Sequence, residues 1–165
     1  MIQKIKASKS EKIIFFFLIS LAIFSLSSFF LIKNKCLFVK DYNPDKLSFD
    51  KPNNIAILNV ECGNVIIELY PNISPNAVER FKTLVRSKAY DDVAFHRVIK
   101  DSLVQAGDLE FGKKGNIDYG KIGTGQSGLG TINSEVDVPF YYERGSVGLA
   151  RTQKYNTEDS QFFIT

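Results

Sequence analysis

The longest apolar run of the chain covers Ile13 to Ile32, twenty residues that hold no charge and only serine as a polar residue type. At 1.5 Å per residue, a helix of this length spans roughly 30 Å, the thickness of a bilayer's hydrocarbon core. A serine hydroxyl can bond a carbonyl of its own helix, so four serines do not prevent insertion. A buried core helix fits less well, because the run lacks a polar face. We therefore expect one transmembrane helix over 13–32, between a basic segment 1–12 and a polar linker 33–53.

Beyond the linker, short apolar runs of β-branched and aromatic residues predict strands separated by turn residues. The predicted strands are Ile55–Val60, Val65–Leu69, Ala94–Ile99, Leu103–Ala106 and Ser146–Ala150. Glu61 to Asn64 joins the first two as a hairpin. Seven glycines between Gly112 and Gly130 exclude regular structure there and predict a long surface loop.

One amphipathic helix interrupts the strands, over about Pro75–Ser87. Ser74 supplies an N-cap and Pro75 a first-turn proline, and apolar residues follow at helical spacing. The order of the elements predicts a mainly β domain with α, over 54–165. An antiparallel β-barrel or sandwich with a helix covering an open end fits that order.

Charge is distributed unevenly along the chain. Residues 1–52 hold nine lysines and four acidic residues, whereas residues 53–165 hold twelve basic and fourteen acidic residues. The basic excess therefore belongs to the N-terminal arm and not to the domain. A nucleic-acid-binding domain would carry that excess itself, so we expect no nucleic-acid partner.

The lysines around the apolar run indicate its orientation. Lys4, Lys6, Lys9 and Lys12 precede the run, and Lys33, Lys35 and Lys40 follow it. The positive-inside tendency narrowly favours a cytoplasmic N-terminus, which places the domain of a single-pass membrane protein on the outer side of the membrane. The alternative is a signal peptide that is cleaved, which would give a secreted protein.

Neither the cysteines nor the histidine predicts a metal site. Cys36 and Cys62 are the only cysteines, and their spacing matches no metal signature, so we expect two free thiols. His96 is the only histidine, which excludes zinc sites built from several histidines, and we expect it to be hydrogen-bonded on a strand. Gly123 to Gly128 matches G-x-G-x-x-G, but no helical pattern follows it, so we expect no nucleotide partner.

Three stretches in this order resemble the cyclophilin family of peptidyl-prolyl cis-trans isomerases, in its bacterial branch. They are Phe95–Asp108, Gly148–Thr152 and Asn156–Thr165. The resemblance runs from about Asn54 to Thr165. It implies a cyclophilin-like antiparallel β-barrel that acts on proline-containing polypeptides without metal or cofactor. With the apolar run described above, we expect this domain to be anchored in the membrane on its periplasmic side.

The resemblance also assigns roles to particular residues. It makes Arg97 the catalytic arginine and Gln105 the glutamine beside it. It makes Leu103 and Phe163 the apolar walls of a slot for proline. It places Ala150, Arg151 and Gln161 in the groove that receives the residues before that proline, and it gives Phe95 and His96 supporting roles.

An arginine suits the chemistry of X-Pro rotation. The rotation loses amide resonance over a barrier of about 20 kcal/mol, and the twisted prolyl nitrogen gains a lone pair. A guanidinium is always charged and presents a rigid fork of donors, so it can bond that nitrogen without proton transfer.

The chain departs from the family at two places. Ser102 stands where cyclophilins usually have an aromatic residue, which should weaken the proline slot, whereas leucine for methionine at Leu103 and Leu149 nearly preserves volume. The resemblance further implies another helix and closing strands after Thr165, so we expect the barrel to be incomplete at the C-terminus. A proline-peptide-binding chaperone module with little catalysis, or an inactive fragment, is the alternative function.

Overall fold

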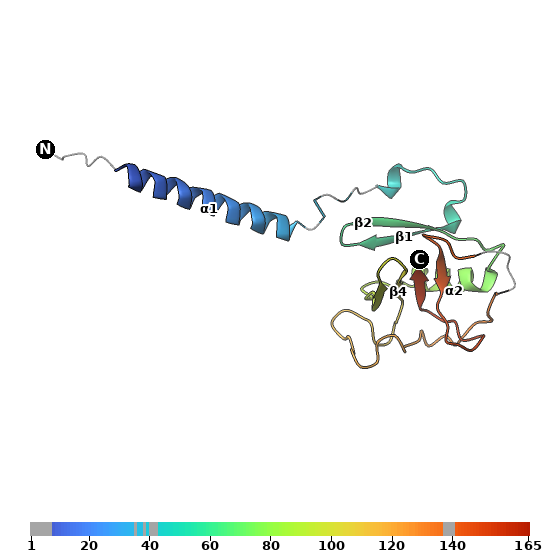
Figure 1. Cartoon of the computed structure of the whole chain (residues 1–165). Coiled ribbons are helices and arrows are strands. Elements are labelled where there is room, and N and C mark those ends of the chain that lie inside the picture. Colours follow the sequence, from blue (N-terminus) through green and yellow to red (C-terminus); the bar gives the residue numbers. More distant parts are fainter. Residues whose placement is uncertain (1–7, 35, 38, 40–42, 137–140) are drawn as a thin grey trace. The chain divides into compact units, whose positions relative to one another are not determined.

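The computed structural model describes residues 8–34, 36–37, 39, 43–136 and 141–165 (Figure 1). Residues 1–7 of the predicted basic segment and residues 35, 38 and 40–42 of the predicted linker lie outside the described part. The chain forms two compact units. One contains the chain up to Lys46 together with Asn59–Val65, and the other contains Leu47–Leu58 and Ile66–Thr165.

The predicted N-terminal helix is confirmed as α1, which covers Lys9–Lys33. Its first turn is closed by a capping box, in which Ser8 Oγ accepts the Glu11 N–H at 3.2 Å and the Glu11 carboxylate accepts the Ser8 N–H at 2.7 Å. The mean hydropathy of α1 reaches 2.5 over 18 consecutive residues, and none of these residues is buried. By length and composition α1 can cross a membrane, a property that a signal sequence shares.

A disulfide joins Cys36 to Cys62, so the prediction of two free thiols is wrong. Cys36 lies three residues after the end of α1, and Cys62 lies in the turn between strands β1 (Ile55–Val60) and β2 (Gly63–Glu68). The hairpin brings the two Cα atoms to 5.0 Å although the residues are 26 positions apart. The cysteine spacing alone could not show this proximity, because it depends on how the linker meets the hairpin turn.

The remaining strands form one antiparallel sheet of four, in the order β3-β4-β6-β5. Their bounds are β3 Arg97–Ile99, β4 Leu103–Ala106, β5 Val147–Leu149 and β6 Phe162–Ile164. The last three residues of the predicted strand 94–99 pair in β3. Within the described part, β1–β2 and this sheet are two separate sheets, so the closed barrel stays a prediction.

Helix α2 covers Pro75–Arg86 and confirms the predicted helix to within one residue. Ser74 occupies the N-cap position, but its side chain makes no capping bond. The Glu135 carboxylate takes that role instead, accepting the N–H groups of Asn76 at 2.8 Å and Ala77 at 3.1 Å. A negative charge there also favours the N-terminal end of the helix dipole.

The core of the second unit packs α2 against Ala56 and Ile67, from the parts of β1 and β2 in that unit, and against one face of the four-stranded sheet. The rings of Phe81, Tyr90 and Phe162 meet one another with centroids 5.3 to 5.5 Å apart. Burial raises the pKa of the Tyr90 hydroxyl, which donates to the Ser160 carbonyl at 2.7 Å. The buried apolar residues of this core are Ala56, Ile67, Phe81, Ala106 and Phe162.

Candidate active site

The register of the four-stranded sheet places one residue from each strand in a single row. Arg97 on β3 pairs with Gln105 on β4, Gln105 pairs with Phe163 on β6, and Phe163 pairs with Gly148 on β5. Residues directly opposite each other in a sheet share a face. The row therefore gathers the predicted catalytic pair and one predicted wall of the proline slot on the same face.

Strand alternation separates this face, which we call the site face, from the core face. Ala106 and Phe162 are at most 4% exposed and belong to the core. Their neighbours Gln105 and Phe163 point to the opposite side, because successive side chains alternate across a strand. Leu103 shares the face of Gln105, two residues away on β4. The period of two therefore places the core and the candidate site on opposite faces of one thin sheet.

Hydrogen bonds link the row to the glycine-rich loop. The Arg97 guanidinium donates to Gln105 Oε1 at 3.2 Å, and Gln105 Nε2 donates to Gln161 Oε1 at 3.0 Å. Gln161 Nε2 in turn donates to the carbonyls of Gly123 and Gly125, each at 3.0 Å. Both glutamine amides are thereby oriented, and Arg97 is held at the exposed end of the chain of bonds.

Asp108 anchors the same loop from the other side. Its side chain is fully buried, and its Oδ1 accepts the N–H groups of Glu110 and Phe111. Its Oδ2 accepts the N–H groups of Gly123 at 2.6 Å and Gly125 at 2.9 Å. A Cβ at position 125 would clash with this carboxylate, so glycine is required for the close approach.

The four donors decide the ionisation of Asp108. Burial disfavours the charged carboxylate and raises its pKa. The hydrogen bonds from Phe111, Gly125, Gly123 and Glu110 together lower the pKa by more than burial raises it, so the pKa lies below its usual value. The predicted surface loop is therefore clamped between Asp108 and Gln161. Asp108 received no separate role from the sequence, although an aspartate two residues after a strand and before a glycine-rich stretch was the available signal.

His96 differs from expectation. It lies just before β3, where its backbone N–H donates to the Gln105 carbonyl at 3.0 Å. Both ring nitrogens are buried without a hydrogen-bond partner within the described part of the chain. The expected side-chain bond on a strand is thus wrong, because the ring packs beside Gly123 instead. Phe95, the other predicted supporting residue, is 37% exposed.

Of the three predicted groove residues, the structure brings two together. The Ala150 N–H donates to the Gln161 carbonyl at 2.7 Å, continuing the β5–β6 pairing beyond the row. Arg151 does not join them. Its guanidinium lies 4.7 Å from the centre of the Tyr155 ring and 3.8 Å from the Glu158 carboxylate.

Ser102 lies exposed in the turn between β3 and β4, where its N–H donates to the Ile99 carbonyl. It offers the site face no apolar surface. Leu103, directly after it, is half-buried. That this position weakens the slot stays a prediction.

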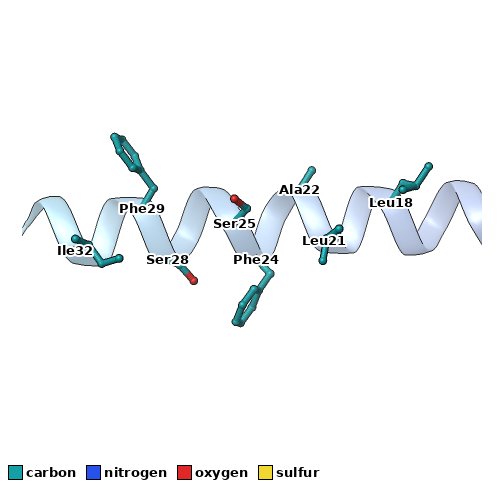
Figure 2. Close-up of a pocket in the computed structure, with 8 residues that line it drawn as sticks. All are labelled: Leu18, Leu21, Ala22, Phe24, Ser25, Ser28, Phe29 and Ile32. Atoms are coloured by element: carbon teal, nitrogen blue, oxygen red, sulfur yellow. The ribbon is translucent and has the colours of Figure 1, made fainter.

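Two further features bear on what the chain can bind. A shallow hollow is lined entirely by residues of α1, among them Phe24, Ser28 and Phe29, and contains no residue of the sheet (Figure 2). Its side chains suit contact with lipid and supply no catalytic group. Across the residues that the structure describes, no cluster of three or more His, Cys, Asp or Glu could hold a metal ion.

Comparison with solved structures agrees with this fold. A Cryptosporidium parvum cyclophilin type peptidyl-prolyl cis-trans isomerase, crystallised in the presence of the dipeptide Ala-Pro, is 29% identical with a TM-score of 0.52. The match covers 62% of this chain and 61% of that chain. A cyclophilin from Hirschia baltica, AquaCyp293, is 21% identical with a TM-score of 0.54, over 76% of this chain and 64% of the other. The latter supports the fold alone.

Sequence comparison defines the family. The family described as cyclophilin type peptidyl-prolyl cis-trans isomerase/CLD matches residues 55–165, and the chain therefore belongs to that family. Bacterial relatives from Brucella suis (strain 1330) and Brucella abortus (strain 2308), both named probable peptidyl-prolyl cis-trans isomerase, are 45% and 44% identical. Each match covers 68% of this chain and 58% of the relative, so the chain spans little more than half the length of these relatives.

Proposed function

We propose that the chain accelerates cis-trans isomerisation of X-Pro bonds in polypeptides, with Arg97 as the catalytic residue and Gln105 orienting it. The observation that carries this function is the hydrogen-bonded row on the site face. An exposed guanidinium is held by Gln105, and the Phe163 ring follows in the same row. The Cryptosporidium relative crystallised with Ala-Pro supports a proline-containing ligand.

Within the site, Arg97 supplies the positive charge, and Phe163 and Leu103 supply the apolar surface. Adjacent strands lie about 4.8 Å apart, and β4 lies between the strands of Arg97 and Phe163, so their backbones are separated by about 10 Å. The two side chains reduce the width of the space between them. Phe163 and Leu103 offer apolar surface to a proline ring. Ala150 and Gln161 would contact the residues of the bound peptide that precede its proline. The guanidinium then donates to the prolyl nitrogen as the amide twists, a bond made chiefly in the transition state.

Replacing Arg97 with alanine tests this function. A charge-assisted hydrogen bond made in the transition state contributes about 1.5 to 3 kcal/mol, so kcat/KM should fall by about one to two decades. The assay follows cis-to-trans conversion of a proline peptide with the full chain in detergent micelles. Lys100→Ala is the matched control, since it removes another exposed positive charge, from the adjacent turn. Wild-type turnover in Arg97→Ala would contradict the proposal.

A binding module with little catalysis is the second candidate, and the exposed Ser102 favours it because it leaves the slot open on one side. Peptide affinity and turnover separate the two functions when they are measured on the same preparation. Binding of a proline peptide without acceleration would support the binding module only.

We further propose that α1 anchors the chain in a membrane, with the domain on the periplasmic side. The Cys36–Cys62 disulfide supports this side, because disulfides persist in oxidising compartments. Fractionation of expressing cells should retain the intact chain in carbonate-washed membranes, and external protease should digest the domain in spheroplasts. A soluble product that has lost α1 would instead establish a cleaved signal and secretion.

A further inference from the structure

Tyr142 lies against Phe163 on the site face. The two ring centroids are 5.1 Å apart at an interplanar angle of 62°, an edge-to-face contact. Tyr142 nevertheless remains 63% exposed. A ring that only filled the core would be buried, so most of this aromatic surface is available to a ligand.

Gly148 makes the room that Tyr142 occupies. It ends the row opposite Phe163, and a Cβ at this position would lie 2.6 Å from the Tyr142 hydroxyl oxygen and 2.9 Å from Phe163 Cζ. Real Cβ atoms do not approach other atoms so closely, so any side chain here would displace one ring or the other. Glycine at this position therefore lets the tyrosine ring lie over β5, next to the phenylalanine ring.

We propose that Tyr142 forms an aromatic wall of the proline slot beside Phe163, an inference that rests on the proposed isomerase function. The slot is then bounded by Leu103 from β4, Phe163 from β6 and Tyr142 above β5. A tyrosine suits this place, because its rigid ring presents a large contact area at little cost in conformational entropy.

This assignment makes Tyr142 a residue of substrate grip and not of chemistry. It lies at the far end of the row from Arg97, so its loss should leave the hydrogen bond to the twisted nitrogen in place. An aromatic contact of this kind is worth about a 2- to 12-fold change in affinity. We expect Tyr142→Ala to raise KM and the dissociation constant of a proline peptide by about that factor, with kcat changed by less.

The experiment compares Tyr142→Ala, Tyr142→Phe and Tyr142→Leu with the wild type, all as the full chain in micelles. Tyr119→Ala is the control, because Tyr119 is 86% exposed and belongs to the glycine-rich loop. Turnover of a proline peptide gives kcat and KM. Anisotropy of a fluorescein-labelled proline peptide gives the dissociation constant, and thermal unfolding shows which variants are folded.

Near-wild-type values in Tyr142→Phe and Tyr119→Ala, with weakened binding in the alanine and leucine variants, would support the wall. Unchanged KM and dissociation constant in a folded Tyr142→Ala or Tyr142→Leu would overturn it. So would a loss in both variants that follows only their loss of thermal stability. If the wild type binds the peptide without accelerating its isomerisation, the isomerase function fails, while the dissociation constants still decide the role of Tyr142.

Discussion

Replacing Asp108 with asparagine should destabilise the domain at neutral pH by an amount that the structure allows us to work out. The carboxylate is fully buried and accepts four backbone N–H groups, two on each oxygen. An asparagine keeps one acceptor oxygen and turns an NH₂ group toward the other two donors. Two buried N–H groups then lose their partners at about 1 to 3 kcal/mol each, for a cost of about 2 to 6 kcal/mol.

The pH dependence gives this prediction its sign. The pKa of Asp108 is lower in the folded chain than in the unfolded chain, where it is about 3.9. The stability that the carboxylate contributes is therefore fully present above about pH 4 and is lost as the pH falls through the lower folded-state value. The difference between the wild type and Asp108→Asn should be largest at pH 7 and should shrink below pH 4.

Urea unfolding followed by tyrosine fluorescence is a suitable assay, because all seven tyrosines lie outside α1 and there is no tryptophan. Glu110→Gln is the matched control, since it makes the same change of charge on an exposed neighbouring residue. An Asp108→Asn variant within about 0.5 kcal/mol of the wild type at pH 7 would refute the reasoning, as that is the range of ordinary surface substitutions. A gap that widened toward pH 3 would refute the assigned sign.

Three further predictions concern the loop, the helix and the disulfide. Gly125→Ala should lower the unfolding midpoint and also kcat/KM, because its Cβ would clash with Asp108 and displace the loop that holds Gln161; normal values of both would contradict the clamp. Arg80→Met should cost about 3 to 5 kcal/mol in urea unfolding, since it leaves the buried Asp159 carboxylate without its ion pair, and a cost below about 1 kcal/mol would contradict this. Cys36→Ser should lower stability by up to about 3.5 kcal/mol and abolish the effect of added reductant; a variant still sensitive to reductant would contradict that.

Local periodicity predicted those elements whose side chains repeat within the element. The helical spacing around Phe81 identified α2, and the short apolar runs identified β4 and, to within one residue at each end, β5. The resemblance then placed Arg97, Gln105 and Phe163, which the register brings into one row. These successes depend on contacts between near neighbours or on motifs within a few residues.

Contacts between distant segments could not be read from the sequence in the same way. The Asp108 carboxylate binds the N–H groups of Gly123 and Gly125, which follow it by 15 and 17 residues, only because the loop between them folds back onto it. The sequence does not distinguish Tyr142 from other surface tyrosines, because its position depends on the space that Gly148 leaves beside it. The expected side-chain hydrogen bond of His96 was wrong for the same reason, because the sequence does not show which groups surround its ring.

The disulfide between Cys36 and Cys62 also changes what proteolysis can do to the chain. The segment between the two cysteines becomes a closed covalent ring, with α1 leaving from one cysteine and β2 from the other. A single cut anywhere within residues 37–61 would open that ring without separating the domain from the helix. Release of the domain by such a cut then requires two independent events, one hydrolytic and one reductive. Exposed linkers are preferred sites of nicking, so a chain nicked in its linker would keep its domain joined to α1 for as long as its surroundings remained oxidising.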